Sequence, residues 1–75
     1  NMLNGVVLIK TWTIRTDEVL KAVQKMPEVK KAFITYGRFD ISAFIEASDY
    51  TAIKVLVDKI NALEAVRSTE TLVEA

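Results

Sequence analysis

The chain has 75 residues, of which 51% are hydrophobic, with ten basic and ten acidic side chains. This composition predicts one folded domain over residues 1–75, and the zero formal charge excludes strong nonspecific attraction to nucleic acid or to an anionic membrane. The chain contains no cysteine or histidine, which excludes disulfides, the usual zinc sites and nucleophiles activated by imidazole. We therefore expect no metal and no cofactor.

The first half of the chain predicts a strand, a helix and a second strand. The apolar, β-branched run over residues 6–12 is typical of a strand, and it carries apolar side chains on both faces. Thr16 is the predicted N-cap of the helix because two acidic residues follow it in the first turn. Pro27 is predicted to end this helix, and the second strand is predicted over residues 29–36.

A hairpin and a second helix are predicted to follow. Gly37 and Arg38 are expected at the tip of a tight hairpin, where glycine supplies a positive φ, and the partner strand is expected over residues 39–47. Ser48 is the predicted N-cap of the second helix because residues 50–63 carry an apolar stripe at helical spacing.

A last strand over residues 66–74 completes the order β-α-β-β-α-β. This order predicts an α+β, ferredoxin-like fold, in which a four-stranded antiparallel sheet carries both helices on one face. The strands also carry apolar side chains on the other face, such as Phe44 opposite Ile41 and Ile45. We therefore expect a homodimer formed through the strands, with a monomer that is well packed by itself as the alternative.

Two segments predict a small-ligand site rather than simple core. In residues 36–40 the glycine turn is able to expose backbone amides, and Asp40 is able to accept hydrogen bonds from an ammonium group. Thr69 and Thr71 are expected to place two hydroxyls on one face of the last strand. The structural alternatives are a simple hairpin glycine, an aspartate bonded to turn amides, and threonines that serve only as strand formers.

Four segments together carry a resemblance to a known family. They are Met26-Pro27-Glu28-Val29, Tyr36-Gly37-Arg38-Phe39-Asp40, Ala47-Ser48-Asp49-Tyr50 and Val66-Arg67-Ser68-Thr69-Glu70-Thr71-Leu72. Over residues 5–74 the chain resembles the effector-binding domain of the Lrp/AsnC transcriptional regulators, also called the RAM domain. The resemblance implies strand-paired homodimers that assemble into higher oligomers and bind a free amino acid at the contacts between dimers.

The resemblance also implies a ligand-binding site in the turn and the last strand. Its residues are Tyr36, Gly37, Arg38, Asp40, Ser68, Thr69 and Thr71. The implied function is a non-catalytic, amino-acid-binding oligomerisation module. Such a module modulates transcription indirectly, as part of full-length Lrp/AsnC-type regulators or as a partner to them.

The chain departs from the family pattern at its N-terminus. Family members usually carry a DNA-binding helix-turn-helix, and here only residues 1–4 precede the resemblance. We therefore expect no direct DNA binding and a stand-alone form that starts at Met2, with a fragment of a longer regulator as the alternative. A cytoplasmic location without a membrane partner is expected, because the sequence contains neither an apolar run of about 20 residues nor a signal peptide.

Two other classes of protein share this order of strands and helices. An ACT-like regulatory domain typically has its glycine after the first strand, where this chain has Thr13-Ile14-Arg15-Thr16. A small enzyme, either acylphosphatase-like or an α+β-barrel protein, is the less favoured alternative. Its acid–base groups would be Arg38, Asp40, Glu46 or Glu70, and no two of the carboxylates have an evident reason to differ in pKa. We expect no catalytic activity.

Overall fold

The structure, a computed structural model, describes residues 1–75. Its elements follow the predicted order, with one short 3₁₀ helix added between the first strand and the first helix. They are β1 (Leu3–Thr11), the 3₁₀ helix (Thr13–Arg15), α1 (Thr16–Gln24), β2 (Val29–Ile34), β3 (Ile41–Ala47), α2 (Tyr50–Asn61) and β4 (Val66–Val73). Neither α-helix is long and apolar enough to cross a bilayer.

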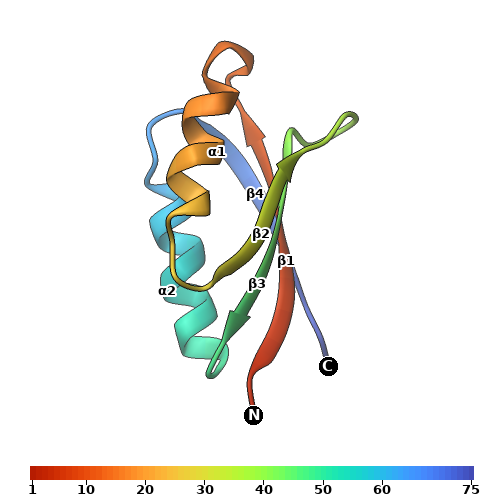
Figure 1. Ribbon diagram of the computed structural model, residues 1–75, viewed down its shortest axis with the longest axis vertical. Coiled ribbons are helices and arrows are strands. Elements are labelled where there is room, and N and C mark those ends of the chain that lie inside the picture. The colour runs from red at the N-terminus through yellow and green to blue at the C-terminus, as the bar shows by residue number, and fades with distance from the viewer.

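The four strands form one antiparallel sheet in the order β2-β3-β1-β4, so β1 and β3 are central and β2 and β4 are the edges. Both helices pack on the same face of this sheet, as Figure 1 shows, and both chain termini lie at one end of the molecule. The α+β, ferredoxin-like fold predicted from the sequence is therefore confirmed. The other face of the sheet carries no helix.

The core lies between the helices and the sheet. Alternation along the strands directs Val7 and Ile9 of β1 and Ile41 and Ile45 of β3 towards the helices, where they are almost fully buried. From the helices, the buried side chains are Val19, Val23, Ile53, Leu56 and Ile60. Burial of each large aliphatic side chain stabilises the fold by about 1.5–3 kcal/mol. The helix-facing side of the sheet is thus largely buried within a single chain.

The opposite side of the sheet, which we call the open face, also carries apolar side chains. They occupy the alternate strand positions: Val6, Leu8, Phe33, Phe44 and Leu72. The rings of Phe33 and Phe44 lie with their centroids 5.9 Å apart. Nevertheless Phe44 remains 43% exposed and Leu72 remains 55% exposed. The open face is therefore an apolar surface without a cover in the single chain.

The start of α1 differs from the prediction. Thr16 already has helical dihedral angles, φ −57° and ψ −45°, and its hydroxyl donates to the carbonyl oxygen of Thr13 at 2.9 Å. The prediction of Thr16 as N-cap is wrong, because the 3₁₀ helix brings the chain into helical geometry one turn earlier. The helix then ends at Gln24, before Pro27, so Pro27 lies in the turn that follows rather than at the helix end.

The start of α2 is displaced by one residue from the prediction. Asp49, not Ser48, is the N-cap, since its extended backbone precedes the helix and its Oδ1 accepts a hydrogen bond from the Ala52 amide at 2.8 Å. The prediction of Ser48 is wrong because both residues are good capping types and the apolar stripe alone does not decide between them. The Ser48 side chain makes no hydrogen bond within the chain.

The connection between β2 and β3 is longer than a tight hairpin. β2 ends at Ile34 and β3 begins at Ile41, so residues 35–40 form what we call the β2–β3 loop. The Thr35 amide donates to the Asp40 carbonyl at 2.9 Å and closes the base of the loop. Gly37 has φ +131°, which confirms the predicted positive φ.

Replacing the observed cap tests this assignment. Asp49→Ala is expected to lower the free energy of unfolding by about 1 kcal/mol, because the Ala52 amide loses its acceptor. Ser48→Ala, the matched control, is expected to change it by less than about 0.5 kcal/mol. Urea denaturation followed by circular dichroism measures both variants, and a larger loss for Ser48→Ala would contradict the assignment.

Candidate functional site

The β2–β3 loop carries four of the predicted site residues and projects beyond the sheet, away from the helices (Figure 1). Tyr36 at its tip is 99% exposed, and Arg38 is also exposed. Apart from Gly37 and its two neighbours in the chain, no residue has an atom within 4 Å of the position that a Cβ on Gly37 would take. The tip of the loop therefore has little contact with its own chain and is free to contact another molecule.

Asp40 at the base of the loop has a different environment. Its Oδ2 accepts hydrogen bonds from the backbone amide of Thr11 at 2.8 Å and from the Thr11 hydroxyl at 3.3 Å. Thr11 is a buried polar residue, and its hydroxyl lies 2.6 Å from that of Thr16. Asp40 thus ties the loop to the end of β1 and the start of α1. No hydrogen bond within the chain uses its second oxygen, Oδ1.

Two further contacts from β1 hold the loop. The Asp40 amide donates to the carbonyl oxygen of Ile9 at 2.8 Å, and the Lys10 ammonium donates to the carbonyl oxygen of Arg38 at 3.3 Å. Sequence reasoning did not identify Lys10 or Thr11 as part of this region. Their contribution arises from strand pairing between residues about thirty positions apart, for which the local sequence carries no signal.

The predicted residues of β4 divide between the two faces of the sheet. Ser68 pairs with Lys10 and lies on the open face, whereas Thr69 pairs with Ile9 and Thr71 pairs with Val7 on the face towards the helices. The Thr69 hydroxyl donates to the side chain of Asn61, at the end of α2, at 3.1 Å. The two threonines do share one face, as predicted, but the β2–β3 loop and Ser68 do not lie on it.

The seven predicted residues do not form a pocket within one chain. The structure has three surface hollows, of about 290, 320 and 390 Å³, and none of them is lined by any of the seven residues. The largest hollow lies on the open face beside Phe44 and Leu72. No hollow of the single chain joins the loop to the β4 threonines.

A cluster of charges lies beside the start of α1. Nη2 of Arg15 is 2.6 Å from Oε2 of Glu18 and 3.1 Å from Oε1 of Glu64. The hydrogen bond from Arg15 holds the pKa of Glu18 below its usual range, and Glu18, followed by Glu64, raises the pKa of Arg15. The cluster is exposed and contributes little to stability. No group of three or more acidic side chains is arranged to hold a metal ion.

Comparison with known proteins gives the family. The family described as the Lrp/AsnC ligand binding domain matches residues 5–74. The chain belongs to this family. The resemblance inferred from the sequence is thereby confirmed, and the domain is a regulatory ligand-binding module rather than an enzyme.

Similar proteins agree with this assignment. The HTH-type transcriptional regulator LysM of Saccharolobus solfataricus is 27% identical over 74 residues, which are 97% of this chain and 52% of LysM. The chain thus spans about half the length of the curated relative that it matches. The protein TTHA0845 from Thermus thermophilus has a similar structure, with a TM-score of 0.94, 27% identity, and coverage of 97% of this chain and 92% of its own.

A third similar structure is that of the transcriptional regulator NMB0573 from Neisseria meningitidis, in complex with L-Met. Its TM-score is 0.85 at 21% identity, with coverage of 97% of this chain and 49% of its own. At this level of identity the likeness shows the fold alone.

The anchoring role of Asp40 has a measurable consequence. Asp40→Ala is expected to lower the free energy of unfolding by about 2 kcal/mol, because the amide of the buried Thr11 loses a charged acceptor. Arg38→Ala, the control from the same loop, is expected to change it by less than about 0.5 kcal/mol, since only its backbone is bonded. Equal values for the two variants in chemical denaturation would contradict this role.

Proposed function

We propose that this domain binds a free amino acid between protomers of a homo-oligomer and, through its state of assembly, modulates transcription indirectly. The observation that carries the proposal is the apolar open face, which a single chain leaves uncovered. The family match supports a regulatory ligand-binding role, and the L-Met complex of the similarly folded regulator supports an amino acid as the ligand class.

A second copy of the chain is the partner that best fits the open face. A two-fold contact places the same apolar set, including Phe33, Phe44 and Leu72, on both sides of the interface. Charge favours the same arrangement. Lys10 lies near the loop end of the open face, and Glu46 lies near the other end. A face-to-face dimer with the strands reversed brings these opposite charges together.

The predicted ligand residues fit a site between protomers. The exposed β2–β3 loop of one protomer offers Oδ1 of Asp40 to an ammonium group and the Gly37 backbone amide to a carboxylate. A neighbouring protomer offers Thr69 and Thr71 of its edge strand. Because such a site exists only in the assembly, ligand binding shifts the population towards that assembly by mass action.

The same surfaces account for the proposed transcriptional role. Full-length Lrp/AsnC-type regulators carry a domain of this kind, so a matching open face gives this chain a means of joining their assemblies. Any effect on transcription then follows from the composition of the assembly and from the amino acid that it holds. The chain's own contact with DNA is not required.

A charge on the open face is expected to break the dimer. Leu72→Glu should give the 8.4 kDa mass of a single chain in sedimentation at micromolar concentration, because two carboxylates would be buried in the interface. Val55→Glu is the control, since Val55 is equally exposed but lies on α2. Wild type and the control should both show a mass of twice that of one chain or a higher multiple of it. A wild-type monomer contradicts the proposal.

The ligand site is tested with variants that preserve local structure. Asp40→Asn keeps an oxygen for the Thr11 amide but removes the charge that binds an ammonium, and Thr71→Val removes one hydroxyl at nearly constant volume. Calorimetry against the twenty amino acids is expected to show binding to wild type and at least tenfold weaker binding to both variants. Thr51→Val, on the exposed start of α2, is the control and should bind as wild type does. Unchanged binding in Asp40→Asn and Thr71→Val contradicts the site.

A further inference from the structure

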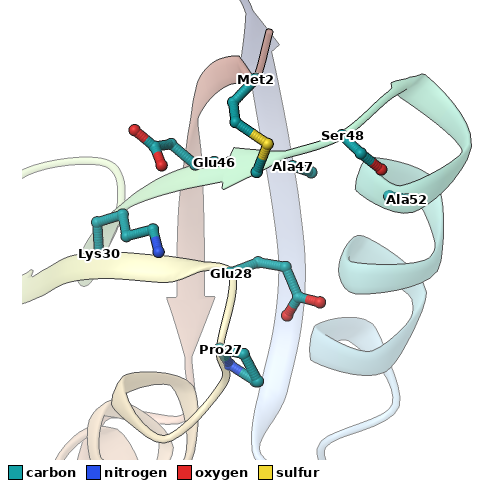
Figure 2. Close-up of a pocket in the computed structure, with 8 residues that line it drawn as sticks. All are labelled: Met2, Pro27, Glu28, Lys30, Glu46, Ala47, Ser48 and Ala52. Carbon is teal, nitrogen blue, oxygen red and sulfur yellow. The ribbon is translucent and has the colours of Figure 1, made fainter.

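A hollow of about 290 Å³ lies between the start of β2 and the N-terminal turn of α2 (Figure 2). Its lining comes mainly from two segments: Pro27, Glu28 and Lys30 around the start of β2, and Ala47 and Ser48 between β3 and α2. Two of the four segments that carried the family resemblance therefore converge on this hollow. The proposed function uses neither of them.

Glu28 has an unusual position in this hollow. Its Oε1 has less than 1 Å² of exposed surface and no hydrogen-bond partner. A backbone hydrogen bond to β3 holds the chain at Glu28, since the Glu46 amide donates to the Glu28 carbonyl at 2.9 Å. In Figure 2 the Glu28 carboxylate points from the start of β2 towards α2. A buried acceptor without a donor is rare in native proteins, and it destabilises the chain that contains it.

No cation of the chain forms an ion pair with this carboxylate. The three ion pairs of the chain join Arg15 to Glu18, Arg15 to Glu64 and Lys54 to Asp58. Lys30 and Glu46 also line the hollow, and neither takes part in an ion pair. In Figure 2 the Glu46 carboxylate points away from Glu28, so the charged groups nearest the hollow are the Glu28 carboxylate and the Lys30 ammonium, which form no ion pair with each other. The unpartnered Glu28 carboxylate favours a cationic group in the ligand.

The remaining lining indicates the size and character of the ligand. Met2, Pro27, Ala47 and Ala52 provide apolar or small side chains, and the Ser48 hydroxyl has no partner in the chain. An ammonium group combines a positive charge with three hydrogen-bond donors, which is the complement of an unpartnered carboxylate. We propose that the hollow binds a small molecule with a primary ammonium group and a short alkyl body, and that the ammonium is held by Glu28.

The buried oxygen does not prevent such binding. Only Oε1 of Glu28 is buried without a partner, so Oε2 is the oxygen that is available to an ammonium group in the hollow. The Ala52 amide is already occupied by Asp49, so the first turn of α2 does not compete for the carboxylate through that group. All lining residues belong to one protomer, and the proposal does not rest on the function proposed above.

Four small probes test whether the ammonium group is what the hollow recognises. Butylamine carries the ammonium alone, norvaline carries it on an amino acid, and butan-1-ol and butyrate lack it. In an NMR titration of backbone amides, the two ammonium compounds are expected to give saturable shifts at residues around the hollow, such as Glu28 and Ser48, and the other two are expected to give none. If only butylamine binds, the ligand class is a simple amine, and if only norvaline binds, it is an amino acid. Equal binding of butan-1-ol overturns the proposal.

Three variants complete the test. Glu28→Gln keeps the shape of the side chain and should weaken butylamine binding at least tenfold, whereas Ala52→Leu should abolish binding by filling the hollow. Glu70→Gln, on the open face, is the matched control and should bind as wild type does. Glu28→Met should raise Tm by about 4 °C or more, because the unpartnered carboxylate is removed. Unchanged butylamine binding in Glu28→Gln, or shifts located away from the hollow, would refute the assignment.

Discussion

The structure depends on a mismatch between a sheet that is apolar on both faces and two short helices that cover only one of them. The helix-facing side chains form a complete core, while Phe44 and Leu72 on the open face remain about half exposed. Hydrophobic burial is the main stabilising term in a domain of this size, so an uncovered apolar face favours association. In the proposed function, the same association forms the ligand site, so that assembly and ligand binding are coupled by geometry.

The positions of the candidate residues follow from this constraint. The β2–β3 loop projects past the sheet, and Asp40 anchors its base to Thr11 while keeping one carboxylate oxygen unbonded. Thr69 and Thr71 lie on an edge strand and face the other way. Neither group completes a pocket alone. In the proposed site, a ligand that requires both groups reports on the presence of a neighbouring protomer.

Much of the fold could be predicted from the sequence, because alternation in the strands and helical spacing in α1 and α2 are local signals. The predictions of both helix N-caps failed, at α1 because a 3₁₀ helix precedes it and at α2 because two neighbouring residues suit the cap position. Ser48 and Asp49 both suit an N-cap, and only the path of the chain selects Asp49. For the site, Gly37 and its positive φ were predictable from the turn, but the bond between Asp40 and Thr11 was not. That bond depends on strand register, whereas the separation of Ser68 from Thr69 follows from alternation along β4 and could have been predicted.

The molar mass of the wild-type chain, measured by light scattering across a dilution series, tests the central claim most directly. If the open face is covered by a second copy, the mass should be a multiple of 8.4 kDa at micromolar concentration and should fall towards that of one chain on dilution. Addition of the bound amino acid should oppose the fall. A mass of 8.4 kDa at every concentration, with and without amino acids, would contradict the account.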